Sequence, residues 1–461
     1  MLERRAIEFI PETERHGKPA SLFTLWFSAN MQMTTVATGL VAGSLGLGLV
    51  SGLTAIILGN VIGGIFMAYH AAQGPKLGIP QMIQSRAQFG VIGANLPVAL
   101  VIILYVGFFT LSAVLGGEAA AHLFHVPQAI GVIIADTATF LLLIFGYDLI
   151  HRYERIMSLV FLVIFAIVTI VLLRDYAVTP LTPAKPAPLA MIVLGISIYA
   201  TWQITYAPYV ADYSRYLPAN TSFLGSSAYT YFGSVIASIW MMALGLLAGL
   251  VASKAANADT TGYFAALLGP SWTWLMLLVI LFGIIGANVL NLYGTAMSVA
   301  TILTSGGETP FARAILTRGM ALRVAVGAAA AFIGSALAIG AGGNFVGAMT
   351  NFLLLLLYVF VPWTAINLTD FYLVRRARYD IAAIYDPRDI YGAINWKTMA
   401  VYAIGILVEI PFMNADLYEG PIAKALGGAD ISWIIGLIVP SVLYIIVNRR
   451  VTAQAAARHT T

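Results

Sequence analysis

The sequence contains no cysteine among its 461 residues. Disulfide bonds, thiolate catalysis and zinc–thiolate sites are therefore excluded. Charged residues are also scarce: they form 10% of the chain, whereas a soluble domain carries about 25%. Hydrophobic residues make up 60% of the chain, and the mean hydropathy is +0.88. Because the shortage of charge extends along the whole chain, the sequence predicts an all-α polytopic membrane protein, not a soluble domain with an anchor.

Several functional signals are missing as well. The first twenty residues are charged and lack a short apolar core with a cleavage site, so no cleavable signal peptide is expected. The histidines suggest no metal site, since His122 and His125 precede Pro127 and are better interpreted as part of a solvated loop. The apolar stretches contain no nucleophile–base pair and no HExxH motif. We therefore expect neither an enzyme nor a bound metal or cofactor.

Long apolar stretches predict 12 transmembrane helices, each near or above the roughly 20 residues that a bilayer requires. The predicted spans are 20–46, 51–73, 94–121, 127–146, 156–174, 189–210, 224–252, 271–300, 320–341, 344–368, 397–415 and 430–448. With a cytoplasmic N-terminus, the inside segments hold 20 Lys and Arg and the outside segments hold 4. This bias predicts a multi-pass protein of the cell inner (plasma) membrane with both termini in the cytoplasm. The net charge of +4 thus reflects topology and does not indicate a nucleic-acid partner.

The loops divide the chain into five parts. We expect a cytoplasmic N-terminal segment (1–19), a ten-helix core (20–368), a cytoplasmic loop (369–396), two additional transmembrane helices (397–448) and a cytoplasmic tail (449–461). The core divides into a first repeat (20–174) and a second repeat (189–368). Between spans two and three, the segment 74–93 is too polar to span and too apolar to float, which predicts a cytoplasmic loop helix lying against the bundle.

The first span has a polar middle that includes Ser28, Asn30 and Gln32. Hydrocarbon offers no partners to such groups, so they must face a cavity or other protein. The sixth span departs from a plain lipid-facing helix in the same way: it carries Trp202, Gln203 and Tyr206 at mid-depth and is interrupted by Pro208.

These two spans begin the two five-span halves of the core. Paired interruptions at matching places in two halves indicate the midplane site of a transporter. Each polar residue alone could instead form a hydrogen bond between helices, and the proline could simply kink its helix. The matched pair of spans favours the site.

The eighth and third spans supply further candidates. Asn288 and Asn291 lie three residues apart and therefore on one face of the eighth span. A carboxamide offers an acceptor and two donors, which can match the edge of a planar heterocycle, although a bond between helices is the alternative for both. In the third span, Tyr105 and Phe108 belong to an aromatic run that could stack on such a ring or simply pack.

Carboxylates near or inside the spans are costly and often functional. Glu118 lies near the outer end of the third span, where a solvated position is equally compatible with the sequence. Asp136 and Glu409 raise the same question in the fourth and eleventh spans. Asp212 begins the sequence DYSRYLP at the cytoplasmic end of the sixth span, and we expect it to hold loops or a gate through a nearby arginine.

Four segments together resemble one known family. WFSANMQ (26–32), GPKLGIPQMIQSRAQFG (74–90), ADYSRYLP (211–218) and NLYGTAMS (291–298) are similar to motifs of the purine–cytosine permease branch of the nucleobase:cation symporter-1 family. The resemblance runs in order from the first span to about the tenth. It implies a LeuT-type fold of five-plus-five inverted repeats with two extra helices. It also implies alternating access and cation-driven import of a nucleobase, either a purine or a cytosine-like pyrimidine.

The resemblance also implies a substrate site. The family holds its base between aromatic faces of spans three and six, which match Phe108 and either Trp202 or Tyr206. Tyr105 stands where cytosine carriers have a polar neighbour. The residues that would bond the base come from spans one, six and eight: Ser28, Asn30, Gln32, Gln203, Asn288 and Asn291. Glu118 and Asp212 remain candidates for gating or coupling.

The coupling ion is inferred from a departure from the family pattern. Sodium-coupled relatives carry hydroxyl side chains just before the asparagines of span eight, where this chain has Gly286 and Ala287. A sodium ion would lack its usual ligands there, so proton coupling is favoured and sodium stays open. The same fold could carry allantoin, a hydantoin, uracil or a vitamin-related pyrimidine, or could serve as a passive facilitator or a nutrient sensor. The expected partners are a small-molecule nucleobase and the lipid bilayer, and the oligomeric state is left open.

Overall fold

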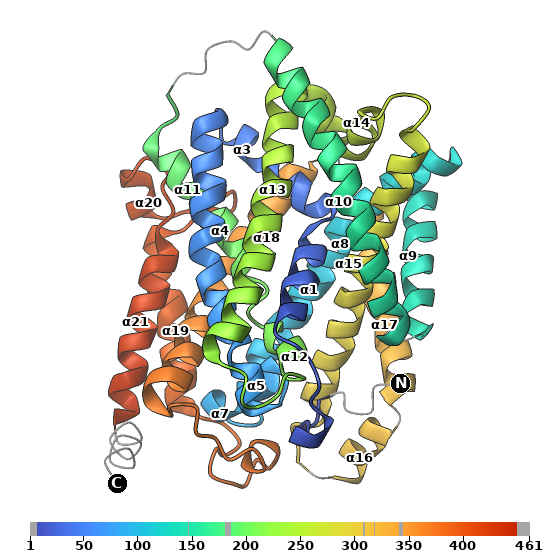
Figure 1. The fold of residues 1–461 in the computed structure, drawn as a ribbon. Helices are drawn as coiled ribbons and strands as arrows, with labels where there is room; N and C mark the ends of the chain where they lie inside the picture. Colours follow the sequence, from blue (N-terminus) through green and yellow to red (C-terminus); the bar gives the residue numbers. More distant parts are fainter. Residues whose placement is uncertain are drawn as a thin grey trace.

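The computed structural model describes residues 7–145, 147–179, 186–307, 309–317, 319–340 and 344–449. Residues 1–6 of the predicted N-terminal segment and residues 450–461 of the predicted tail lie outside the described residues. Nearly all regular structure in the described parts is helical (Figure 1).

The first half of the chain contains the following helices: η1 (Glu12–Glu14), α1 (Ala20–Asn30), α2 (Met33–Gly39), α3 (Val41–Ser44), α4 (Leu49–Ala71), α5 (Gln73–Leu77), α6 (Gln81–Gln84), α7 (Arg86–Phe89), α8 (Asn95–Phe124), α9 (Gln128–Phe145), α10 (Tyr147–Val178), α11 (Leu189–Ile204) and α12 (Val210–Ser214). The second half contains α13 (Phe223–Ala258), α14 (Thr260–Ala266), α15 (Thr273–Leu303), α16 (Pro310–Thr317), α17 (Gly319–Gly340), α18 (Phe345–Leu368), η2 (Thr369–Val374), η3 (Ala383–Tyr385), α19 (Trp396–Glu409), η4 (Ile410–Phe412), α20 (Pro421–Ala425) and α21 (Ser432–Val447). A short antiparallel pair of strands, β1 (Asn414–Ala415) and β2 (Tyr418–Glu419), lies between η4 and α20.

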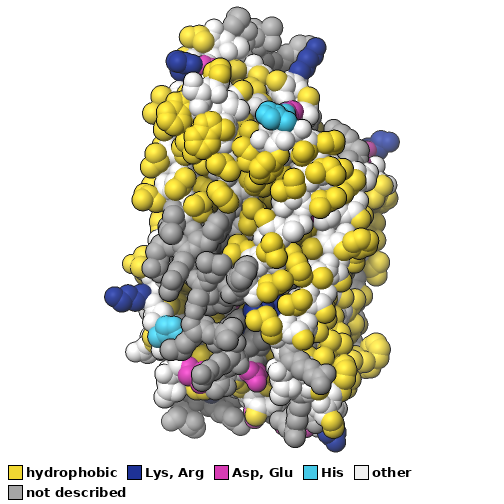
Figure 2. Space-filling model, turned by 90° about the vertical axis from the view of Figure 1, so that its right-hand side faces the viewer, with side chains coloured by type: hydrophobic (Ala, Val, Ile, Leu, Met, Phe, Trp, Pro, Cys, Tyr) yellow, Lys and Arg dark blue, Asp and Glu magenta, His cyan; other side chains and the backbone are white. Residues whose placement is uncertain are grey.

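Seven helices in the described parts are long and apolar enough to cross a membrane, and α9, α11 and α21 are shorter apolar helices. The face shown in Figure 2 is covered by hydrophobic side chains over most of its height, with the few charged side chains mainly toward its two ends. Such a surface suits lipid. The prediction of an all-α multi-pass membrane protein is confirmed, and the count of twelve spans stays a prediction. In Figure 1, α1 begins and α21 ends at the lower side, which α5, α7 and α16 share.

The first and sixth spans are both broken, as the sequence predicts. Helix α1 ends at Asn30, the backbone of Gln32 is extended (φ −145°, ψ 164°), and α2 begins one residue later. Helix α11 ends at Ile204 and α12 begins only at Val210. Pro208 lies between them, where its missing N–H and its ring prevent a continuous helix. At each break, some backbone N–H and C=O groups lack partners within a helix. Residues at both breaks line the same cavity.

The segment 74–93 differs from its prediction. The segment is helical and packed against the bundle, but it forms three short helices, α5, α6 and α7, instead of one, and their side chains are almost all buried. Gly78 and Gly90 follow α5 and α7 with φ of +66° and +83°, a conformation that glycine adopts at little cost. These two turns reverse the chain and fold the loop into the bundle.

Glycines bring several helix backbones into direct contact. A Cβ at Gly59 of α4 would collide with the backbone of Ile196 in α11, and one at Gly63 would collide with the backbone of Ala200. A Cβ at Gly39 of α2 would collide with Met242 of α13. A Cβ at Gly233 of α13 would meet the backbone of Phe23 in α1. Small residues permit such close approach in membrane helices. We call α1, α2, α4, α11 and α13 the glycine-packed block.

The two additional helices, α19 and α21, pack against each other and against α18. Helix α18 continues into the π-helical turn η2, where buried Asp370 accepts hydrogen bonds from Gln88 (2.9 Å), Tyr379 (2.7 Å) and Tyr444 (3.0 Å). This one carboxylate therefore joins α7, the loop 375–395 and α21 to the end of α18. The predicted loop 369–396 is thus helical at its start and anchored to the bundle.

Candidate functional site

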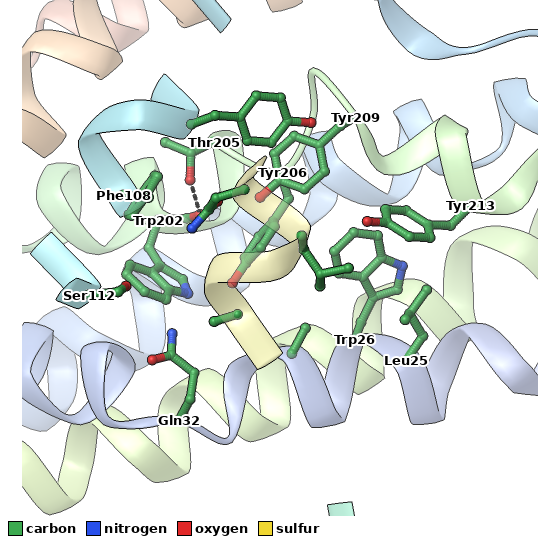
Figure 3. A pocket seen from close by; sticks show the side chains of 15 residues that line it. Leu25, Trp26, Gln32, Phe108, Ser112, Trp202, Thr205, Tyr206, Tyr209 and Tyr213 are labelled. Carbon is green, nitrogen blue, oxygen red and sulfur yellow. Dashed lines mark hydrogen bonds between the residues drawn. The ribbon is translucent and has the colours of Figure 1, made fainter. Parts of the chain in front are cut away.

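A cavity lies where the two broken spans meet α8 and α15 (Figure 3). Its volume of about 60 Å³ has room for about four to six water molecules at the ~10–15 Å³ that each requires. The side chains around it are aromatic, apolar or neutral and polar, and none of them carries a charge: Leu25, Trp26, Ala29, Gln32, Tyr105, Phe108, Ser112, Trp202, Thr205, Tyr206, Tyr209, Tyr213, Ala287, Leu290 and Asn291. Such a site suits a small neutral molecule with a planar face.

Gln32 reaches the cavity because of the break in the first span. Its side-chain Oε1 accepts a hydrogen bond from the backbone N–H of Thr34 (2.7 Å) and so caps α2. The backbone N–H can only donate, which fixes the orientation of the amide. With Oε1 at the cap, Nε2 is the atom that can donate to a molecule in the cavity. Figure 3 shows this side chain below Ser112 and Trp202.

The orientation of Asn291 is fixed by a chain of hydrogen bonds that starts at a backbone carbonyl. Asn288 Nδ2 donates to the carbonyl oxygen of Phe109 (3.1 Å), so Asn288 presents its Oδ1 to the next residue in the chain. Asn291 Nδ2 donates to that Oδ1 (3.1 Å). Asn291 therefore presents its own Oδ1, an acceptor, to the cavity. Asn288 itself is fully buried outside the cavity and positions its neighbour.

Aromatic rings form one wall of the cavity. Phe108 of α8 meets Trp202 of α11 edge to face, with ring centroids 5.6 Å apart. On its other side Phe108 meets Phe352 of α18, with centroids 5.2 Å apart. A Cβ at Gly107 would collide with the ring of Phe352, so this ring lies directly on the backbone of α8. Helix α18 thus packs against Phe108 from outside the cavity lining.

A cluster of four tyrosines and one tryptophan forms the opposite part of the lining. Trp26 of α1 meets Tyr206 and Tyr213 edge to face, with centroids 5.2 and 5.4 Å apart. Tyr209 lies 5.1 Å from Tyr105 and 5.7 Å from Tyr206, measured between centroids. Figure 3 shows Trp26, Tyr209 and Tyr213 at the far end of the cavity from Gln32 and Ser112. The tyrosine hydroxyls place several polar atoms at this aromatic end of the cavity.

Asn30 lies beside the cavity lining and not in it. Its Oδ1 accepts hydrogen bonds from Trp202 Nε1 (2.8 Å), Tyr206 OH (2.9 Å) and Ser238 Oγ (2.8 Å). Its Nδ2 donates to Ser234 Oγ (3.0 Å). The side chain is fully buried, and it holds two aromatic residues of the cavity from behind.

The other predicted polar contacts of spans one and six also lie outside the main cavity. Gln203 is fully buried and bonds to Asn60 and Ser238 (2.9 and 3.0 Å), which ties α11 to α4 and α13. Ser28 lines a smaller neighbouring cavity, to which Gln32 also contributes. That smaller cavity is further bounded by Ala29, Met157, Phe161, Gly283, Gly286, Ala287 and Leu290.

The structure places the two gate or coupling candidates at opposite ends of the bundle. Glu118 lies near the end of α8, where its Oε2 accepts a hydrogen bond from the N–H of Thr261 in the first turn of α14 (3.4 Å). Asp212 of α12 accepts a hydrogen bond from the N–H of Gln81 at the start of α6 (2.8 Å). Arg215 donates to the backbone oxygen of Asp212 (3.2 Å). Asp212 therefore holds a loop helix, and neither acid lines the cavity.

Of the predicted binding residues, Gln32, Tyr105, Phe108, Trp202, Tyr206 and Asn291 line the cavity. Thr205, another mid-depth residue of the sixth span, also lines it, whereas sequence reasoning missed Trp26, Ser112, Tyr209 and Tyr213. Ser112 could have been found, because it follows Phe108 by four residues and shares its helix face. Tyr209 follows Pro208, and Tyr213 belongs to the segment DYSRYLP that the sequence predicts at the cytoplasmic end of the span.

Ser112 gives a prediction of moderate size. Its Oγ lies 2.9 Å from Thr34 Oγ1 and on the cavity wall. Replacing Ser112 by alanine should raise the KM for uptake about fivefold, as expected for one hydrogen bond of ~1 kcal/mol. Thr110→Ala is the matched control, because Thr110 bonds to the backbone of its own helix and lies outside the lining. Equal KM values for the two variants would remove Ser112 from the site.

Comparison with known proteins gives the same picture. Residues 9–436 match the family described as permeases for cytosine/purines, uracil, thiamine and allantoin. The chain is 44% identical over 456 residues to a protein of Bacillus subtilis named as a purine-cytosine permease, YxlA, a match that covers 97% of this chain and 96% of that one. It is 23% identical over 462 residues to the purine-cytosine permease fcyB of Emericella nidulans, covering 96% and 88%.

The fold also has solved counterparts. The structure of Mhp1, a nucleobase-cation-symport-1 family transporter in a closed conformation with bromovinylhydantoin bound, superposes with a TM-score of 0.78 at 20% identity. The match covers 98% of this chain and 97% of that one. An inward-facing conformation of Mhp1 gives a TM-score of 0.77. The LeuT-type fold implied by the sequence resemblance is confirmed. The chain belongs to the family of permeases for cytosine/purines, uracil, thiamine and allantoin.

Proposed function

We propose that this permease imports a neutral nucleobase, a purine or a cytosine-like pyrimidine, by cation symport through alternating access. The observation that carries the proposal is the cavity between the two broken spans, with its uncharged lining and its aromatic wall. We further propose that the protein lies in the inner (plasma) membrane of the cell with both termini in the cytoplasm.

Two oriented amides support a nucleobase as substrate. Gln32 can donate to the bound molecule through Nε2, and Asn291 can accept from it through Oδ1. The substrate must therefore present an acceptor toward Gln32 and a donor toward Asn291. A heterocyclic amide or amidine edge has both groups in one plane. Because Phe108 and Trp202 meet edge to face, with 88° between their planes, one of these rings can offer its face to that plane and the other its edge.

The smaller cavity supports proton coupling. It lies between α1 and α15, where Gly286 and Ala287 stand in place of the hydroxyl residues of sodium-coupled relatives. Its polar side chains are those of Ser28 and Gln32. A sodium ion prefers several oxygen ligands, and this lining supplies few of them from side chains. A proton needs no such cage.

The names of two relatives indicate other heterocycles as alternative substrates. A vitamin B6 transporter of Saccharomyces cerevisiae is 26% identical over 296 residues, and a hydantoin permease of Microbacterium maritypicum is 35% identical over 77 residues. Hydantoins and allantoin also carry adjacent N–H and C=O groups. A panel of adenine, cytosine, uracil, hydantoin, allantoin and pyridoxine, tested for thermal stabilisation of the purified protein, would rank these classes.

Uptake by reconstituted vesicles tests the function and its coupling. With an acidic outside buffer and no sodium, we expect labelled adenine or cytosine to accumulate above its external concentration. A sodium gradient without a pH gradient should give only equilibration. Accumulation that follows sodium would overturn proton coupling. Equilibration under both gradients would instead favour a passive facilitator, and no uptake of any panel member would overturn the proposed function.

A further inference from the structure

Glu409, the last residue of α19, lies far from the cavity in sequence and has an unusual environment. Its side chain is 0% exposed, and both carboxyl oxygens are without a hydrogen-bond partner among the described residues. A Cβ at Gly436 of α21 would collide with Glu409 Oε1, so the carboxyl lies directly against the backbone of α21. An ionised carboxylate in such a place is very costly unless it is paired.

A second acid lies close to Glu409 but is fully satisfied. Asp430 is also 0% exposed and accepts hydrogen bonds from Tyr358 OH (2.6 Å), Ser432 Oγ (2.6 Å) and the N–H groups of Ser432 and Asn414 (both 2.9 Å). The two carboxyl groups interact electrostatically. Four donors stabilise the ionised form of Asp430, whereas Glu409 has none. Of these two acids, Glu409 is the one that, within the described part of the chain, lacks donors to stabilise a charge.

We propose that Glu409 holds an exchangeable proton and is a coupling site of the transport cycle; this rests on the proposed function of a proton-driven importer. Binding of one proton converts the Glu409 carboxylate to the acid and changes its charge from −1 to 0. The proton enters when Glu409 is accessible from outside and leaves when it is accessible from the cytoplasm. No other group changes its covalent bonds.

The contacts of this pair of acids explain how the proton could affect the cavity. Tyr358, which donates to Asp430, belongs to α18, the same helix that places Phe352 against Phe108. The backbone oxygen of Asp430 accepts a hydrogen bond from Ser197 Oγ of α11 (2.7 Å). Helix α11 also carries Trp202 of the cavity. Loss of the proton places a second negative charge beside Asp430, which destabilises the arrangement that holds α18 and α11.

None of the titratable groups that the structure describes around Glu409 is a cation that could pair with its charge. Binding a proton is therefore the way in which this carboxylate becomes neutral. The titratable groups that interact with it are Asp430, Tyr358 and Tyr402, and none of these is a cation. Among the ion pairs between described residues, neither Glu409 nor Asp430 takes part. Another buried acid, Asp136, receives a hydrogen bond from Ser335 Oγ (2.5 Å) between α9 and α17. This hydrogen bond joins α9 to α17, whereas those of Asp430 involve Tyr358 of α18 and Ser197 of α11.

Glu409→Gln tests the proposal, because glutamine has the shape and charge of the protonated acid. With one proton per substrate and an outside buffer one pH unit more acidic, the natural protein should accumulate adenine or cytosine up to about tenfold. The variant should still exchange labelled for unlabelled substrate across the vesicle membrane, but its acid-driven accumulation ratio should fall to one. Asp136→Asn is the matched control and should keep the accumulation of the natural protein.

Each outcome bears on the proposal. Undiminished acid-driven accumulation by Glu409→Gln would overturn it, as would accumulation by the natural protein that follows only sodium. No transport by the natural protein would contradict the proposed function instead. If Glu409→Gln does not fold, Tyr358→Phe provides the second test: it removes one donor from Asp430 and should shift the pH at which uptake is half-maximal. An unchanged pH profile in that variant would also overturn the proposal.

Discussion

Replacing Asn291 by alanine is expected to abolish uptake at low substrate concentration. The Oδ1 of Asn291 is the acceptor that its hydrogen bonds to Asn288 leave facing the cavity. Its removal leaves a donor of the bound base unpaired and frees Asn288, at about 1.5 kcal/mol for each lost interaction. A total of about 3 kcal/mol corresponds to a roughly 100-fold loss of transport efficiency. Initial uptake rates over a range of substrate concentrations measure this loss.

The folded state should survive this change, because Asn291 is only partly buried and the truncation enlarges an existing cavity. Thr295→Ala is the control on the same helix. The Thr295 hydroxyl bonds to the backbone of Asn291 and lies outside the lining, so this variant should transport normally. Near-normal uptake by Asn291→Ala would remove Asn291 from the site.

Replacing Asn30 by alanine is expected to damage both stability and transport. The change leaves three buried donors without their shared acceptor: Trp202 Nε1, Tyr206 OH and Ser238 Oγ. Each unsatisfied buried donor costs about 1–3 kcal/mol, so the free energy of unfolding should fall by about 3 kcal/mol or more. Trp202 and Tyr206 then lose their fixed positions in the cavity wall. A lower melting temperature in detergent and a loss of uptake should therefore appear together.

Asn30→Asp separates positioning from direct binding. Aspartate keeps an oxygen in place for the three donors, which can also stabilise its charge. Its second carboxyl oxygen replaces the Nδ2 that donates to the carbonyl oxygen of Trp26 (2.8 Å). This variant should therefore recover part of the melting temperature and part of the uptake. If Asn30→Ala had the same melting temperature and the same KM as the natural protein, Asn30 would not be the residue that positions Trp202 and Tyr206.

The first span shows how far the sequence could lead. Its polar residues predicted that this helix avoids lipid, and its pairing with the sixth span predicted where the helices break. The sequence did not show which polar group enters the cavity, because the extended backbone at Gln32 resets the helical phase. Asn30 precedes this break and turns to α13, whereas Gln32 follows α1 and turns to the cavity. The 3.6-residue helical period does not continue across the break, so it cannot show which of Asn30 and Gln32 faces the cavity.

The sixth span shows a second limit. Trp202 and Tyr206 were alternatives for a single aromatic position, yet both line the cavity. The five residues between α11 and α12 do not follow the 3.6-residue period of a helix. Side chains that would not share one helix face can therefore line the same cavity. Tyr209 and Tyr213 enter the site for this reason. The length of a break depends on tertiary contacts, which no local pattern contains.

The glycine-packed block has a mechanical consequence. Where backbones touch, no layer of flexible side chains remains that could rearrange to let one helix slide past another. Helices α1, α2, α4, α11 and α13 should therefore move together as one rigid piece. Contacts between large rings, such as Phe108 with Phe352, can part without breaking a hydrogen bond. The cavity lies at the boundary between the rigid piece and α8, α15 and α18, so a shift of one piece against the other would change access to the substrate while leaving both pieces internally unchanged.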